Sequence, residues 1–282
     1  MKVLPFQIPK PENHALFYQE DKALIFYDKF HQHDEIQVSY IAEGEGTLVV
    51  GDTINYYKKG DLLSIGSNLP HVFKSDRFAY KNSEMITLFF SRDAFGESFF
   101  NLEDFRELKP FFKKVSYGFK YSSKSDELKH LFIQLHSKSK LQRFLILLEI
   151  LKLVSKSKTQ PLSSYIQYKK YTDSEGKRMR DVLDYTMQHY PNQISLHDIA
   201  AISAMTKNAF CKYFKKRTNK TYFQFLNELR IEKASKILLM EEVFTIADVS
   251  EKAGFNNISN FNRQFKNIKK MTPSSYRKKK NL

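Results

Sequence analysis

Polar side chains that could bind a metal ion or a small polar molecule recur at alternate positions near residue 33. They belong to His31, His33, Glu35 and Gln37. Residues two apart on a β-strand point to the same face, so a strand here would present all four together. A third histidine, His71, follows Pro70 and is expected at the end of a later strand. Three imidazoles that converge inside a barrel would suit a divalent metal ion.

Gln37 changes how this group is interpreted, because a neutral amide is a poor metal ligand. We therefore predict a ligand pocket built from histidine, glutamine and aromatic side chains, with no metal and no cofactor. Two alternatives stay open. The histidines could hold a metal ion, or they could simply be polar residues near an opening of the barrel.

Short β-strands are the elements that must position these side chains. Apolar and polar residues alternate over 35–40, 47–50 and 62–65, a period that is typical of strands. Glycine-containing turns separate these runs near Gly44, Gly51 and Gly60. Residues 1–125 are therefore predicted to form a many-stranded β-domain.

A helical period begins after this domain. Leu128 and Leu131 start a series of apolar residues at helical spacing that extends over 126–155. The apolar face of this segment is wide enough either to pack on the β-domain or to form a homodimer interface. Residues 156–177 are polar and aperiodic, which is typical of a linker. Helical periodicity covers 178–282, so the predicted fold class is α+β with several domains.

The region after the linker contains an internal repeat with an offset of about 50 residues. In each copy a short helix with a small residue, Ala200 or Ala253, leads through a tight turn into a second helix. The side chains of Thr206 and Asn257 are predicted to cap the second helices. Each second helix has two inward phenylalanines four residues apart: Phe210 and Phe214, or Phe261 and Phe265. This is the pattern of a helix-turn-helix.

Positive charge is concentrated in the same region. The chain has a formal net charge of +15, of which residues 177–282 contribute +12 and residues 1–176 contribute +3. A basic helical repeat beside a nearly neutral domain indicates a polyanionic partner for the basic part alone. Together with the helix-turn-helix pattern, this charge distribution predicts binding to double-stranded DNA.

Several motifs of the repeat resemble the AraC family of bacterial transcription regulators. They include Ile194-Ser-Leu-x-Asp-Ile-Ala200, Gly254-Phe255, Ser259-x-Phe261-x-Arg263-x-Phe265-Lys266 and Thr272-Pro-x-x-Tyr276-Arg277. The resemblance implies an N-terminal effector domain, two helix-turn-helix units within 178–282 and a long helix between them at about 222–240. The two recognition helices would enter successive major grooves about 34 Å apart. The sequence departs from the family at Asn219 and Met271, where glycine is usual.

The resemblance also assigns contacts with DNA. Arginine can pair with guanine, asparagine with adenine, and isoleucine can touch a thymine methyl group. The implied base readers are Lys207, Asn208, Cys211, Lys212, Ile258, Ser259, Asn262 and Arg263. The implied contacts to phosphates, which position a protein without reading the sequence, are Thr206, Lys215, Lys216, Asn257 and Lys266. For each implied base reader, a phosphate contact or plain solvent exposure remains the alternative.

The front of the chain resembles a cupin, a barrel found in many AraC-family members. His31-x-His33 and Gly44 match its first motif, Gly60-Asp61 and His71 match its second, and Gln37 replaces the usual glutamate. The resemblance implies a jelly-roll barrel with a concave pocket. Its occupant would be a small effector such as a sugar or another metabolite, and the chain would form a homodimer. An N-terminal arm would bring Phe6, His14, Phe17 and Tyr18 to the barrel mouth.

We therefore interpret the chain as an effector-responsive transcription regulator that is not an enzyme, with RNA polymerase as a candidate further partner. The single cysteine, Cys211, rules out an internal disulfide and suits a cytoplasmic protein. No apolar run reaches the ~20 residues of a membrane span, so no membrane partner is expected. Two rival functions stay open: a metal-dependent cupin enzyme fused to a DNA-binding domain, and a DNA binder that needs no effector.

Overall fold

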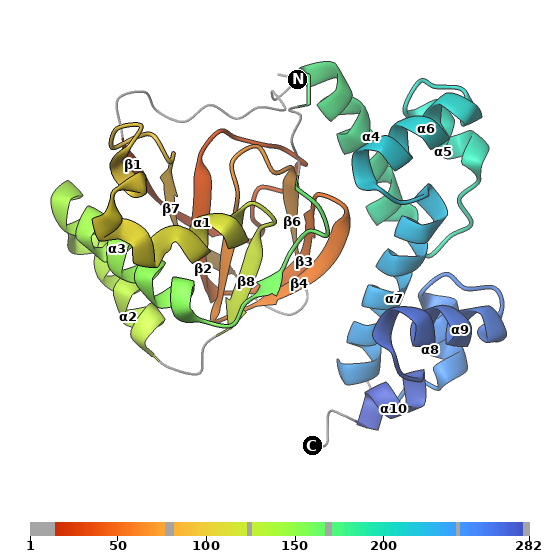
Figure 1. Cartoon of the computed structure of the whole chain (residues 1–282). Helices are drawn as coiled ribbons and strands as arrows, with labels where there is room; N and C mark the ends of the chain where they lie inside the picture. The colour runs from red at the N-terminus through yellow and green to blue at the C-terminus, as the bar shows by residue number, and fades with distance from the viewer. Residues whose placement is uncertain (1–14, 77–81, 123–125, 167–170, 241–242, 279–282) are drawn as a thin grey trace. The chain divides into compact units, whose positions relative to one another are not determined.

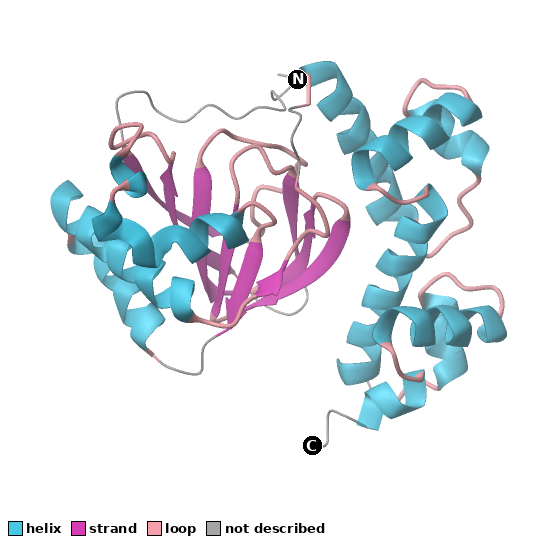
Figure 2. Cartoon of the chain, in the orientation of Figure 1, coloured by secondary structure: helices cyan, strands magenta, loops and turns pink. Residues whose placement is uncertain are grey.

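The computed structural model describes residues 15–76, 82–122, 126–166, 171–240 and 243–278. The chain divides into two compact units, residues 1–176 and residues 177–282 (Figure 1). Figure 2 shows that the described strands lie in the first unit and that the second unit is helical. No helix among the described residues is long and apolar enough to cross a membrane.

Nine described strands form two antiparallel sheets in the first unit. The strands are β1 (Leu16–Ala23), β2 (Ile36–Glu43), β3 (Glu45–Val50), β4 (Thr53–Lys58), β5 (Asp61–Ile65), β6 (His71–Ser75), β7 (Ser83–Phe90), β8 (Phe119–Ser122) and β9 (Gln160–Pro161). The larger sheet has the order β1-β7-β2-β5-β8-β9 and the smaller one β4-β3-β6. The three alternating runs of the sequence lie in β2, β3 and β5, which confirms that they are strands.

Strand β2 separates two hydrophobic cores. Ile36, Val38 and Tyr40 point to the face of the larger sheet that the helices cover. These helices are α1 (Lys109–Val115), α2 (Glu127–Ile133) and α3 (Lys140–Lys156) (Figure 1). The alternate residues Gln37 and Ser39 point into the barrel, whose apolar part includes Leu48, Leu63, Phe73 and Met85. The predicted alternation along this strand is therefore confirmed.

Helical structure begins earlier than the sequence pattern predicted. Two 3₁₀ helices, η1 (Phe99–Asn101) and η2 (Glu103–Leu108), and then α1 precede β8. Phe111 and Phe112 of α1 are both buried although they are adjacent in the sequence. With only seven residues, α1 is too short for its buried face of Phe111, Phe112 and Val115 to repeat and so reveal a helical period in the sequence.

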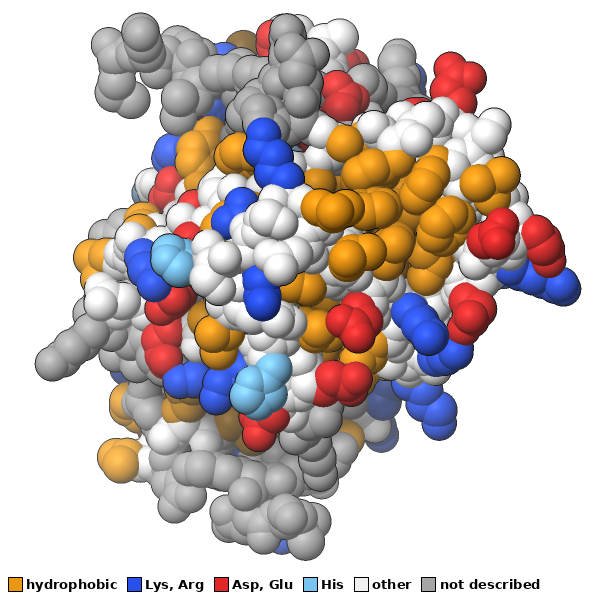
Figure 3. All heavy atoms as spheres, turned by 90° about the vertical axis from the view of Figure 1, so that its left-hand side faces the viewer, with side chains coloured by type: hydrophobic (Ala, Val, Ile, Leu, Met, Phe, Trp, Pro, Cys, Tyr) orange, Lys and Arg blue, Asp and Glu red, His pale blue; other side chains and the backbone are white. Residues whose placement is uncertain are grey.

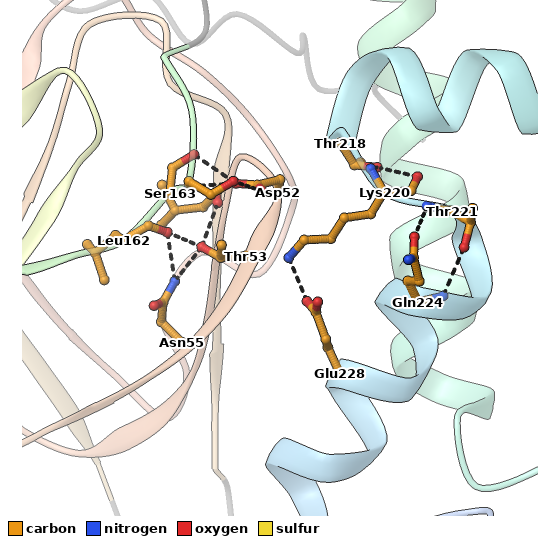
Figure 4. A network of polar contacts seen from close by, with 12 residues as sticks. Asp52, Thr53, Asn55, Leu162, Ser163, Thr218, Lys220, Thr221, Gln224 and Glu228 are labelled. Carbon is orange, nitrogen blue, oxygen red and sulfur yellow. Dashed lines mark hydrogen bonds and ion pairs between the residues drawn. The ribbon is translucent and has the colours of Figure 1, made fainter. Parts of the chain in front are cut away.

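Residues 156–166 of the predicted linker pack on the barrel instead of connecting two domains freely. Strand β9 pairs with β8, and Leu162 is fully buried in the barrel core. The Asp52 carboxylate accepts hydrogen bonds from Ser163 Oγ at 3.0 Å and from the Ser164 amide at 2.9 Å (Figure 4). Two polar residues of the predicted linker, Ser163 and Ser164, thus bond to a carboxylate of the barrel.

The second unit contains two helix-turn-helix pairs around one long helix. The helices are α4 (Asp173–His189), α5 (Leu196–Ile202), α6 (Lys207–Thr218), α7 (Tyr222–Met240), α8 (Ile246–Lys252), α9 (Ile258–Lys269) and α10 (Pro273–Lys278). The pairs are α5–α6 and α8–α9, and α7 has the bounds that the resemblance implied. Figure 4 shows one anchor of α7, the ion pair between Lys220 and Glu228 at 2.7 Å.

The first helix of each pair begins with the same local motif. Ser195 and Asp198 form a capping box at α5, and Thr245 and Asp248 form the corresponding box 50 residues later at α8. Hydrogen bonds from the capping residue hold the pKa of both aspartates below the usual value. Each box satisfies two backbone N–H groups that a helix start leaves without partners.

Left-handed residues form the turns of both pairs. Ala204 has φ +52° and Gly254 has φ +90°, at matching positions between the two helices of a pair. After the second helices, Asn219 has φ +54° and Lys270 has φ +60°. The family's glycine position after α9 is Met271, whereas the left-handed residue is its neighbour Lys270. The αL conformation costs most residues with a side chain about 1–2 kcal/mol, so Ala204 and Lys270 are strained, whereas asparagine tolerates this conformation.

Candidate nucleic-acid interface and ligand pocket

Each recognition helix buries its two phenylalanines and exposes the opposite face. Phe210 and Phe214 of α6 are fully buried and contact Tyr222 of α7, with ring centroids at 5.6 and 5.5 Å. Phe261 and Phe265 of α9 are buried in the same way. Their packing prevents rotation of each helix about its axis, so the exposed face has a defined direction.

The predicted base readers all lie on these exposed faces. On α6 they are Lys207, Asn208, Cys211 and Lys212, and on α9 they are Ile258, Ser259, Asn262 and Arg263. Arg263 donates a hydrogen bond from Nη2 to Asn260 Oδ1 at 2.9 Å, one turn earlier on the same helix. Ile258 keeps 45% of its surface exposed at the start of α9. These side chains are accessible to a DNA groove, and their assignment to bases stays a prediction.

The residues predicted to contact phosphates are exposed as well. Thr206 Oγ1 accepts a hydrogen bond from the Ala209 amide, and Asn257 Oδ1 accepts from the amides of Ser259 and Asn260. Both residues are therefore the helix caps that the sequence predicted. The lysines of this group, Lys215, Lys216 and Lys266, are exposed on α6 and α9.

Arg230 of α7 links the loop between α4 and α5 to the turn of the second helix-turn-helix pair, and the sequence reasoning missed it. Its Nε donates to the carbonyl of Tyr190 at 2.8 Å, and its Nη2 donates to the carbonyl of Asn192 at 2.8 Å. Its guanidinium lies 5.7 Å from the ring centroid of Phe255, directly after the turn glycine Gly254. Burial lowers the pKa of Arg230 below its usual value. The available signal was the segment Arg230-Ile-x-x-Ala234, which also resembles the AraC family.

Three histidines converge inside the first unit. One ring nitrogen each of His31, His33 and His71 lies within 4.8 Å of the other two, and all three residues are buried. The backbones of His31 and His71 exchange two hydrogen bonds, of 3.0 and 2.9 Å. Strand β2 begins only at Ile36, so an isolated bridge and not a strand positions His31. The expectation that His71 ends a strand is also wrong, because this residue begins β6.

A chain of polar contacts leads from the histidines into the barrel. His33 Nε2 lies 3.1 Å from Gln37 Oε1, Gln37 Nε2 donates to Ser39 Oγ at 2.9 Å, and Ser39 Oγ lies 2.8 Å from Thr87 Oγ1. Gln37, Ser39 and Thr87 are all buried. The sequence reasoning missed Ser39 and Thr87. The alternation that selected Gln37 continues to Ser39, whereas Thr87 is brought there only by pairing of β2 with β7.

Glu35 is separated from the other predicted pocket residues. It lies in a bend before β2, and its side chain is 24% exposed. Its Oε2 is 3.9 Å from His33 Nδ1, on the side of the imidazole away from Gln37. The structure therefore brings together four of the five predicted pocket residues. The fifth, Glu35, lies on the Nδ1 side of His33 and away from Gln37.

Gln32 connects this cluster to Tyr171, which lies two residues before α4. Gln32 stands between His31 and His33 in the sequence, and its side chain is buried. Its Nε2 donates to the carbonyl of Tyr171 at 3.3 Å. The Tyr171 amide donates back to Gln32 Oε1 at 3.4 Å. The Phe30 ring packs edge-on against the Tyr171 ring. No local sequence pattern connects residues that are so far apart along the chain.

The predicted N-terminal arm is only partly within the described residues. Phe17 and Tyr18 belong to β1, which pairs with β7 along its whole length, so they are strand residues and not an arm. Phe6 and His14 lie outside the described residues. Phe89, which pairs with Phe17 across the strands, packs edge-on against His33 with centroids at 5.3 Å.

Comparisons with known proteins match both units. Residues 15–152 match the AraC-like ligand binding domain, and residues 199–279 match a helix-turn-helix domain. The Tn10 TetD protein of Escherichia coli is 33% identical over 102 residues, which are 36% of this chain and 73% of that protein. The chain belongs to the AraC family of transcriptional regulators. The AraC resemblance and the predicted α+β fold class, with a cupin-like first domain, are thereby confirmed.

Two further relatives differ in how much of each protein the match covers. The uncharacterized HTH-type regulator YdeC of Bacillus subtilis is 34% identical over 113 residues, 40% of this chain and 38% of YdeC. The chain thus spans well under half the length of this relative. The Msm operon regulatory protein of Streptococcus mutans is 22% identical over 248 residues, 87% of this chain and 84% of that protein.

Proposed function

We propose that this chain is a sequence-specific DNA-binding transcription regulator that responds to a small effector bound in its first unit. The main support for this proposal is the pair of recognition helices. Buried phenylalanines fix each helix so that its predicted base readers are exposed. The unit that contains both helices has a net charge of +12. A basic domain with two exposed recognition helices suits binding in the major groove of DNA. Catalysis forms no part of the proposal, and we place the protein in the cytoplasm with RNA polymerase as a further partner.

The contact between Gln32 and Tyr171 supports the effector response. Gln32 lies between His31 and His33, so an effector that contacts either histidine would displace its backbone. Gln32 in turn holds Tyr171, in the segment directly before α4, by two hydrogen bonds. A ligand shifts a conformational equilibrium only if it binds the two states with different affinity. We propose that the effector does so by favouring one arrangement of this contact.

Arg263→Ala tests sequence-specific recognition. We expect it to weaken binding to an operator fragment by about 10- to 100-fold, because a bidentate contact to guanine is worth roughly 1–3 kcal/mol. Binding to unrelated DNA should change by less than about twofold, since a base contact adds little to non-specific binding. Fluorescence anisotropy on an operator selected from random DNA measures both affinities.

Lys266→Ala is the matched control for Arg263→Ala, because this residue lies on the same helix among the predicted phosphate contacts. It should weaken binding to both DNAs by a similar factor. If Arg263→Ala lowered the affinity for both DNAs by the same factor, Arg263 would be assigned to the phosphate contacts instead of the base readers. Selection that returns no preferred sequence would contradict the proposed function itself.

We also propose that α3 contributes to a homodimer interface. Leu141 and Leu145 are 68% and 56% exposed on one face of this helix, with the partly buried Phe144 and Leu148 beside them. Figure 3, which views the molecule from the side of α2 and α3, shows a hydrophobic patch on this face. Soluble monomers rarely expose a large contiguous apolar patch, and a second copy could cover it by twofold symmetry.

Leu145→Glu is expected to convert a dimer into a monomer while leaving each chain folded, because a charge would be buried without a partner in the interface. Sedimentation velocity at micromolar concentration measures the change. Leu24→Glu is the matched control. Leu24 directly follows the last residue of β1, is 54% exposed and does not belong to α3. A wild-type protein that sediments as a monomer at this concentration would contradict the interface.

A further inference from the structure

We propose that His197 is a phosphate contact of the first helix-turn-helix pair that forms only while its imidazole is protonated, so that operator affinity rises as the pH falls. This role rests on the proposed DNA-binding function and adds a contact that the motifs of the sequence did not assign. Three features of the molecule support it: a hollow beside the first recognition helix, the charges around the imidazole and a difference between the two repeats.

A hollow of about 470 Å³ lies between α5 and the start of α6. Its α5 side includes His197, Ala200 and Ala201, and its other side includes Thr206, Lys207 and Asn208. Lys207 and Asn208 are predicted base readers, and Thr206 is a predicted phosphate contact. The hollow therefore adjoins the proposed DNA interface, and His197 is the titratable side chain of its α5 wall.

A phosphate of the DNA backbone is the occupant that this hollow fits. In a helix-turn-helix the first helix crosses the backbone while the second enters the major groove, and α5 is the first helix of its pair. The unit has a net charge of +12, which complements a polyanion. The His197 side chain is 76% exposed, so a phosphate can reach it. A protonated imidazole donates from both ring nitrogens and would form a charge-assisted hydrogen bond with a phosphate oxygen.

The charges around His197 allow the ring to respond to pH, and histidine is the residue type that changes charge between pH 5 and 8. Asp198 Oδ1 lies 3.7 Å from His197 Nδ1 and favours the protonated ring. Hydrogen bonds from Ser195 hold the pKa of Asp198 below its usual value, so this carboxylate stays charged between pH 6 and 8. Among the described residues that line the hollow, Lys207 carries the other charge, and it favours the neutral ring. A bound phosphate adds negative charge beside the ring, so DNA binding and proton uptake favour each other.

The second helix-turn-helix pair lacks this imidazole. The capping boxes of α5 and α8 begin at Ser195 and Thr245, so His197 corresponds to Ala247. Ala247 is exposed like His197, but its side chain cannot titrate. The other histidine of the sequence from 177 to 282 is His189, which is half-buried in α4. We therefore expect one proton-dependent phosphate contact per chain, in the first pair.

Operator titrations of the full-length chain by fluorescence anisotropy at pH 6 and pH 8, each at several salt concentrations, test the contact. The wild-type affinity should be about two- to fivefold higher at pH 6, the contribution of one exposed ion pair. The slope of log K against log salt should be steeper at pH 6 by about 0.9, the share of one phosphate. His197→Ala should remove the difference in slope, and the matched control His189→Gln should keep it.

His197→Arg distinguishes a proton-dependent contact from a structural role of the imidazole. Arginine stays charged at both pH values, so this variant should show the steep slope at pH 8 as well as at pH 6. A wild-type slope that is the same at both pH values, or a difference in slope that persists in His197→Ala, would overturn the contact. Selective operator binding at pH 8 does not require the charged imidazole, so it supports the regulator function whatever the result at pH 6.

Discussion

Raising the salt concentration from 50 to 200 mM is expected to weaken operator binding by at least about 10³-fold. A protein that neutralises about 6–10 phosphates releases their counterions, and this loses roughly 10³–10⁵ in affinity over that range. The exposed lysines of the two recognition helices, including Lys215, Lys216 and Lys266, are the proposed phosphate contacts on both helix-turn-helix pairs. Anisotropy titrations at four salt concentrations on one operator fragment give the slope of log K against log salt.

Variants of exposed lysines locate the contacts that cause this slope. Lys215→Ala and Lys216→Ala should each reduce the slope by about 1, the share of one phosphate contact. Lys129→Ala is the matched control, since Lys129 is an exposed lysine of α2 in the first unit, and it should leave the slope unchanged. A flat salt response of the wild-type protein would contradict docking through the basic faces of α6 and α9.

Gly254→Ala is expected to destabilise the second unit by about 2–5 kcal/mol. The αL conformation alone costs a residue with a side chain about 1–2 kcal/mol, and forcing an added methyl group into a packed site costs about 1–3 kcal/mol more. The new Cβ would lie 2.5 Å from the Tyr190 carbonyl oxygen, 2.8 Å from that of Pro191 and 2.9 Å from Arg230 Nε. Because Arg230 links this turn to the loop that leads into α5, operator binding should fall by more than about 100-fold, equivalent to about 2.8 kcal/mol.

Gly60→Ala is the matched control for the turn substitution. Gly60 has φ +89°, nearly the φ of Gly254, but no atom lies within 4 Å of the position that the added methyl group would take. The control therefore carries the backbone strain of about 1–2 kcal/mol without the steric clash. Urea denaturation followed by circular dichroism measures both variants. Equal destabilisation by the two substitutions would show that Tyr190 and Pro191 do not constrain the turn.

Most of the second unit could be predicted because helix signals are local. The long helix was expected at about 222–240 and lies at Tyr222–Met240. The caps Thr206 and Asn257 were predicted from residue type and position, since a cap bonds to a backbone N–H two or three residues later. The motif marked Met271 as the departure from glycine but did not reveal that Lys270 is the left-handed residue, because a motif contains no backbone angles.

The first unit was predicted less completely because strands depend on partners far away in the sequence. The runs over 35–40, 47–50 and 62–65 were recognised by their period, but the boundary of β2 at Ile36 was not. That boundary follows from the bridge of His31 to His71, which is a tertiary contact. For the same reason the pairing of β9 with β8 was missed in a segment whose composition suggested a solvated linker.

Residue types and their spacing were enough to identify the polar groups of this protein, which are three histidines with Gln37 near its start and two basic recognition helices near its end. Folding alone arranges these groups in space. A backbone carbonyl oxygen lies within hydrogen-bond distance of Nδ1 of each histidine, and Gln32 holds Tyr171 across 139 positions of the chain. Residue types and spacings describe neighbours along the chain, whereas ligand geometry depends on distances that folding alone creates.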